Sequence, residues 1–70
     1  MRFELLAGDE WVGQYPSRRV AMADAELRAA KRGQHVRWSR QDEDGDTIGH
    51  LEPATADPPF TVRRRDERGR

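Results

Sequence analysis

The feature that most constrains the fold is one helical segment near the middle of the chain, RRVAMADAELRAAKR. It contains no glycine or proline and is rich in alanine, leucine, glutamate and arginine, which are good helix formers. Ser17 before it can cap the first turn, and Gly33 after it suits the left-handed conformation found after many helix ends. The sequence therefore predicts a helix over residues of about 17–32.

Two apolar stripes run along this predicted helix. The larger has the three- and four-residue spacing of a core-facing surface, so we expect it to pack on a sheet. It consists of Val20, Ala23, Leu27 and Ala30. The smaller stripe consists of Met22, Ala25 and Ala29. This second stripe has two interpretations: alanine is simply a good surface helix former, or the stripe is a shallow contact surface for a second subunit.

Two short segments before the helix alternate between apolar and polar residues, as half-buried strands do. They are RFELL and WVGQY, with the turn AGDE between them, so residues 2–15 predict a β-hairpin. Gly13 in the second segment indicates a bulge or the close approach of a neighbouring side chain, such as a tryptophan.

Two segments after the helix, HVRWSR and TIGHL, predict a second hairpin around the turn QDEDGD. Ile48 and Leu51 are three residues apart and cannot share a face of a regular strand. A bulge at Gly49 is expected to bring both side chains inward. Further along, Phe60 and Val62 are among the few apolar residues that can anchor the chain to the body.

The order of these elements predicts an α+β fold of the ββαββ type. Two hairpins form an antiparallel four-stranded sheet, and the helix packs on one face to give a two-layer sandwich. One small domain is expected over residues 1–62, followed by a disordered arginine-rich tail over residues 63–70.

The composition excludes several classes of protein. The chain has no cysteine, which rules out disulfides, cysteine-based zinc sites and thiol nucleophiles. It also has no apolar run long enough for a signal peptide or a membrane span. We therefore expect a cytoplasmic protein with no membrane association. The predominance of arginine over lysine, together with abundant alanine, is typical of a GC-rich bacterial genome.

The size of the chain favours a partner. A domain of about 70 residues buries only ~60% of the surface that its unfolded chain exposes, and such a core rarely supplies more than ~3–5 kcal/mol. Natural chains of this size often add disulfides, a metal or a partner subunit. With disulfides excluded, we expect self-association to supply additional stability.

The acidic turn resembles a calcium-binding loop only in composition. An EF-hand loop needs glycine at its sixth position and glutamate at its twelfth. When Asp42 is placed first, Thr47 is sixth and Pro53 is twelfth. When Gly45 is placed sixth instead, the twelfth residue is Leu51. We therefore interpret the segment as a charged hairpin turn.

His35 and His50 are expected near the same end of the second hairpin, with the acidic turn at the opposite end. Two histidines without a third ligand do not make a metal site, and we interpret them as exposed strand residues. No nucleophile, base and orienting group fall into a recognisable motif. We therefore expect a protein that is not an enzyme and has no cofactor or metal.

The sheet face away from the helix is a candidate contact surface. It is predicted to carry His35 and Arg37, because Trp38 alternates with them and is expected to face the helix. Trp11 and Tyr15 either join this face or pack against the helix, and the sequence leaves both arrangements open. If they join it, aromatic rings beside arginine are typical of surfaces that bind single-stranded nucleic acid.

The charge distribution points to the C-terminal segment. Residues 1–60 have a net charge of −3, whereas residues 61–70 have a net charge of +3. Arginines in such a segment can contact phosphates, or they can form a solvated tail that offsets the acidic body. The possible nucleic-acid contacts are Arg63, Arg64, Arg65 and Arg68.

Together these features predict a small non-enzymatic binding or regulatory module that acts through protein–protein contact, chiefly self-association as a homodimer. The possible partner-binding residues are Met22, Ala25, Ala29, His35 and Arg37. The alternative is a nucleic-acid-associated accessory protein that uses the arginine-rich segment and an aromatic or basic sheet face.

Overall fold

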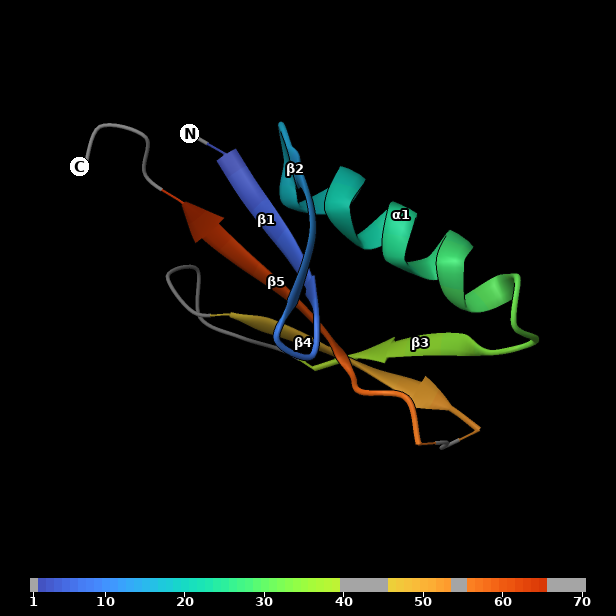
Figure 1. Cartoon of the computed structure of the whole chain (residues 1–70). Helices are drawn as coiled ribbons and strands as arrows, with labels where there is room; N and C mark the ends of the chain where they lie inside the picture. The colour runs from blue at the N-terminus through green and yellow to red at the C-terminus, as the bar shows by residue number, and fades with distance from the viewer. Residues whose placement is uncertain (1, 40–45, 54–55, 66–70) are drawn as a thin grey trace.

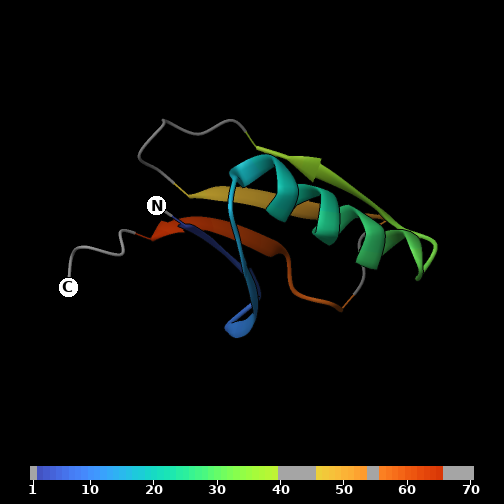
Figure 2. The same cartoon turned by 90° about the horizontal axis from the view of Figure 1, so that it is seen from above.

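One antiparallel sheet carries a helix on one face (Figures 1 and 2). The computed structural model describes residues 2–39, 46–53 and 56–65, and this part of the chain contains five strands and one helix. In chain order these are β1 (Arg2–Ala7), β2 (Glu10–Tyr15), α1 (Arg18–Ala30), β3 (His35–Trp38), β4 (Thr47–Glu52) and β5 (Phe60–Arg65). The prediction of an α+β two-layer sandwich is confirmed, with one more strand than expected.

The additional strand, β5, lies in the middle of the sheet, whose order is β2-β1-β5-β4-β3. β5 pairs with β1 as far as Arg2 opposite Arg65, and with β4 on its other side. The two predicted hairpins form, but β5 separates them. Phe60 and Val62 are buried at alternate positions of β5, and burial of this pair on the helix side explains why the segment joins the sheet.

The position of β5 corrects the domain boundary expected at residue 62. Three of the arginines assigned to a disordered tail, Arg63, Arg64 and Arg65, lie in a sheet strand. Arg68 and the rest of the expected tail lie outside the described residues.

The ends of α1 follow the predicted signals. The Ser17 hydroxyl accepts a hydrogen bond from the Val20 backbone N–H at 3.2 Å. At the other end, Gly33 has a φ of 75°, and its N–H donates to the Ala30 carbonyl at 3.0 Å. The next N–H, of residue 34, donates to the Ala29 carbonyl, which completes a Schellman motif. The helix ends at Ala30, two residues before the expected limit.

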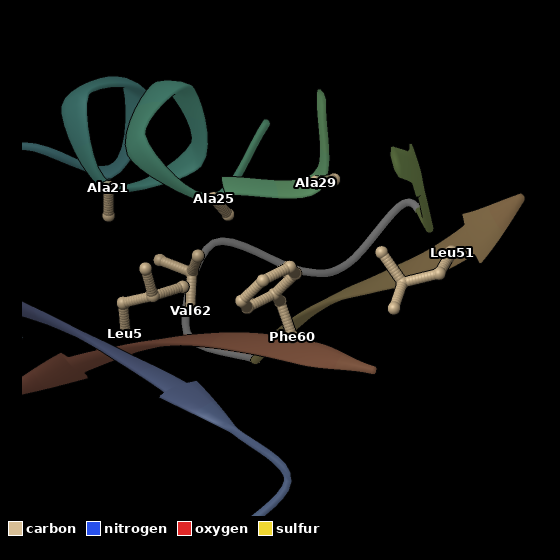
Figure 3. Close-up of a cluster of buried hydrophobic side chains, with 7 residues drawn as sticks. All are labelled: Leu5, Ala21, Ala25, Ala29, Leu51, Phe60 and Val62. Carbon is tan, nitrogen blue, oxygen red and sulfur yellow. The ribbon is translucent and has the colours of Figure 1, made fainter. Parts of the chain in front are cut away.

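The face of α1 that packs on the sheet is the opposite of the predicted one. Ala21, Ala25 and Ala29 are at most 1% exposed and point toward the sheet, where larger apolar side chains meet them (Figure 3). These are Leu5, Leu51, Phe60 and Val62. Because the sheet supplies the bulk, small residues on the helix let its backbone approach closely.

This reversal affects the predicted partner-binding residues. Ala25 and Ala29 belong to the core and cannot contact a partner, and Met22 is partly buried against that core. By contrast, Val20 and Leu27, which were expected to face the sheet, are 43% and 57% exposed. Sequence spacing favoured the larger side chains, whereas packing selected the smaller ones.

The two strand glycines provide space for aromatic rings. Gly49 pairs with Trp38, and a Cβ added to Gly49 would lie 2.6 Å from the Trp38 ring and 2.5 Å from Val36. β4 keeps a regular register with both neighbours, so Ile48 and Leu51 lie on opposite faces, and the bulge expected at Gly49 is not present.

Gly13 has the predicted irregularity beside it. The register of β1 and β2 shifts so that Leu5 pairs with Gly13 and Leu6 with Trp11. The close neighbour of Gly13 is Tyr15 rather than a tryptophan: its hydroxyl lies 3.1 Å from the position of an added Cβ. This bulge changes the twist of β2 next to Trp11.

Candidate functional site

The outer surface of α1 carries an apolar stripe. We define the outer helix stripe as Val20, Ala23, Leu27 and Ala30, all of which are exposed. At 100° per residue these side chains lie opposite the buried alanines. Charged residues of both signs flank the stripe. They are Arg19 and Glu26 on one side and Asp24 and Lys31 on the other. Such an arrangement is typical of a helix face that packs against another protein surface.

Two polar contacts hold α1 on the sheet. The Tyr15 hydroxyl donates a hydrogen bond to the Asp24 carboxylate, which also accepts from Arg28 Nε at 3.1 Å. The hydrogen bond from Tyr15, followed by that from Arg28, lowers the pKa of Asp24. Burial, followed by the bond to Asp24, raises the pKa of Tyr15. On the other side of the helix, Trp38 Nε1 donates to Glu26 at 2.8 Å. Tyr15 therefore packs against the helix, which is one of the two arrangements that the sequence left open for this residue.

The face of the sheet away from α1 is polar and rich in arginine. Residues that pair across strands share a face, which places His35 and Arg37 here as predicted. We define the open sheet face as Arg2, Glu4, Leu6, Gln14, His35, Arg37, Ile48, His50, Glu52, Thr61, Arg63 and Arg65. Leu6 pairs with Trp11 at the shifted end of β2, so Trp11 adjoins this face at the edge of the sheet, whereas Tyr15 pairs with Phe3 on the helix side. The expected platform of tryptophan and tyrosine together beside arginine is therefore not found on it.

Glu4 organises one half of the open sheet face. It is buried, and its carboxylate accepts hydrogen bonds from Arg65 at 2.5 Å and Arg63 at 3.4 Å. The bond from Arg65 is the main reason that the pKa of Glu4 lies below its usual value, although desolvation opposes it. Two of the arginines predicted to contact nucleic acid are therefore engaged within the sheet, and Arg64 lies on the helix side, opposite Phe3.

Glu52 organises the other half. Its carboxylate accepts a hydrogen bond from Arg37 Nε at 2.7 Å and lies 3.8 Å from His35 Nε2. His50 pairs with Arg37 across the strands. In the part of the chain that the structure describes, no three histidine, aspartate or glutamate side chains gather as a metal site would require. The acidic turn, residues 40–45, lies outside that part.

A cleft lies between the tip of the β1–β2 hairpin and the C-terminal half of α1. It has a volume of about 480 Å³. We call it the Trp11 cleft, and its lining is Ala7, Glu10, Trp11, Val12, Arg28, Arg32, Asp57, Pro58 and Phe60. Trp11 is 55% exposed and lines this cleft. This is the position of the second residue whose placement the sequence left open. No local pattern in the sequence marks this cleft, because its walls come from three separate segments, residues 7–12, 28–32 and 57–60.

Comparison with known proteins adds no assignment. The chain matches no protein-family model, no curated protein and no solved structure among those with which it was compared. Within the described residues, no helix is long and apolar enough to cross a membrane.

Proposed function

We propose that the protein is a non-enzymatic cytoplasmic binding module that associates with a second copy of itself through the outer helix stripe. The observation that carries this proposal is the exposure of Leu27, at 57%, together with Val20 in an unbroken apolar line on the side of α1 away from the sheet. A chain with so small a core gains stability when such a surface is covered.

The stripe is complementary to itself. When two copies of α1 pack antiparallel about a two-fold axis level with residue 25, Leu27 lies against the partner's Ala23. In the same arrangement Val20 lies against the partner's Ala30. Each large side chain thus meets a small one, which allows close helix packing. The chain has a net charge of zero, so long-range repulsion does not oppose association.

The expected association is weak. Burying a leucine or valine side chain contributes about 1.5–3 kcal/mol relative to leaving it exposed, before the cost of association is subtracted. One helix from each copy covers less than the roughly 1,200 Å² at which stable interfaces begin. A dimer that forms and dissociates with concentration is therefore the expected state.

Sedimentation equilibrium over a concentration series tests the proposal. We expect the average mass to rise from 8.1 kDa toward twice that value. Leu27→Glu should hold the mass at the monomer value without unfolding the chain, because the side chain is exposed. Arg37→Gln on the open sheet face serves as the matched control and should associate as wild type does. A monomer mass at every concentration would contradict the proposal.

The open sheet face supports a second candidate, binding of single-stranded nucleic acid. Its described residues include four arginines and two glutamates, and this excess of positive charge favours phosphate contacts. Fluorescence anisotropy with a labelled oligonucleotide should show binding that weakens as salt is raised, and Arg2→Gln with Arg37→Gln should reduce it. No binding at low salt would exclude this candidate. Deleting residues 63–70 would not test nucleic-acid binding alone, because the deletion also removes half of β5.

A further inference from the structure

The Trp11 cleft has the size of a small-molecule site. Its volume of about 480 Å³ falls within the range of roughly 300–1,000 Å³ that is typical of ligand pockets. Ala7, Trp11 and Val12 supply apolar surface, while the charged residues come from α1, the turn after it, β2 and the connection between β4 and β5. The lining therefore combines charged groups with apolar surface, as small-molecule sites do.

Contacts in the surrounding structure hold the cleft open. At the hairpin tip, the N–H of Gly8 donates to the Pro59 carbonyl at 3.0 Å, which ties the turn to the β4–β5 connection. Gly8 has a φ of 62°, and an added Cβ would lie 2.8 Å from Pro58. Arg32 and Asp57, which both line the cleft, form an ion pair at 3.4 Å. The hairpin tip and the β4–β5 connection are therefore joined by a backbone hydrogen bond before any ligand arrives.

Trp11 provides a stacking surface. A tryptophan indole is among the largest apolar groups that a small domain can bury, yet this one is 55% exposed. It lies beside the register shift of β2 and lines the cleft. A planar ring that entered the cleft would cover part of the exposed indole and gain apolar contact with the lining.

Two arginines determine the charge that the cleft favours. Arg28 lies in the last turn of α1, where it also donates to Asp24, and Arg32 lies in the turn that follows the helix; both line the cleft. Arg32 is engaged by Asp57, but both side chains are about half exposed and such a pair is worth little. A carboxylate inside the cleft can replace Asp57 and accept two parallel hydrogen bonds from the guanidinium fork.

We infer that the Trp11 cleft binds an aromatic monocarboxylate, with the ring against Trp11 and the carboxylate on Arg32, supported by Arg28. Glu10 and Asp57 also line the cleft, so its formal charge is zero before binding. These two acids disfavour ligands with several negative charges, such as nucleotides. The inference does not depend on self-association, because the outer helix stripe lies on a different surface of α1.

The test compares N-acetylphenylalanine with its uncharged amide on the full ¹⁵N-labelled chain. Titration followed by NMR should shift the Trp11 indole N–H and the backbone amides near Arg32, with the carboxylate binding more tightly than the amide. Arg32→Gln should weaken carboxylate binding about tenfold and leave binding of the amide nearly unchanged. Arg19→Gln, outside the cleft, is the matched control and should bind as wild type does.

Three results would overturn the inference. They are no change at the Trp11 indole up to the solubility limit of the probe, equal affinity for the carboxylate and the amide, or wild-type affinity in Arg32→Gln. The comparison of the two probes uses the wild-type chain alone, so it remains decisive even if the substitution disturbs folding.

Discussion

Single residues decide how the rings and charges of this small domain are packed. Gly49 is the clearest case: its missing side chain leaves room for Trp38, which pairs with it across β3 and β4 and reaches Glu26 on the helix. The sequence correctly indicated an irregularity at Gly13, whereas the bulge expected at Gly49 is not present. The sequence could not show which ring each glycine accommodates, because that depends on the pairing register.

Gly49→Ala should destabilise the fold by about 1–3 kcal/mol, because the new methyl group overlaps both Val36 and the Trp38 ring. Adding Val36→Ala should recover part of this loss, so the double variant should be more stable than the sum of the single effects predicts. Urea unfolding of the four chains in this cycle measures the coupling. Strict additivity would show that the two side chains do not compete for the same space.

Glu4 should contribute stability that depends on pH. In the folded state the pKa of Glu4 lies below its usual value, chiefly because of the hydrogen bond from Arg65. A carboxyl group with a lowered pKa stabilises the fold above its unfolded pKa and loses that contribution as the pH falls through the folded pKa. The melting temperature of wild type should therefore exceed that of Glu4→Gln at pH 6, and the difference should shrink below pH 4.5.

Arg37→Gln supplies a control for this measurement, because it removes an exposed contact to a different glutamate. Its difference from wild type should be small at both pH values. A Glu4→Gln difference that stays constant from pH 6 to acid would contradict the role assigned to the Glu4 carboxylate.

At the scale of elements, local signals placed most segments but not their faces or neighbours. The N-cap at Ser17, the left-handed Gly33 and the turn at Gly8 were all legible in the sequence, because each depends on a few adjacent residues. The inward face of α1 and the central place of β5 were not. Both depend on which side chains from distant strands fill the space between the two layers.

The two faces of α1 can be distinguished by enlarging one alanine on each. Ala25→Leu should destabilise the domain by about 1–3 kcal/mol, because Ala25 is fully buried against the sheet. Ala23→Leu adds the same atoms to the exposed outer face and should change stability by less than about 0.5 kcal/mol. Thermal unfolding compares the pair. A larger loss of stability in Ala23→Leu than in Ala25→Leu would contradict this orientation of α1 and favour the one that the sequence spacing predicted.

For the whole molecule, the candidate sites were harder to predict than the fold. Helix and strand periodicities sufficed for an α+β sandwich, whereas the partner-binding residues depended on which helix face lies outward. Two-residue alternation is a local pattern, so the sequence correctly predicted His35 and Arg37 on the open sheet face. It predicted Ala25 and Ala29 on the outward side of α1, where the structure has the outer helix stripe instead. The Trp11 cleft assembles from three separate segments, and no local pattern marks it.

The proposed meeting of two copies at the outer helix stripe can be followed residue by residue in backbone NMR spectra of the full chain over a dilution series. We predict that the concentration-dependent shifts are centred on the amides of Val20, Ala23, Leu27 and Ala30. Spectra that do not change with concentration, or shifts centred on β2, β3 or the open sheet face, would contradict the account.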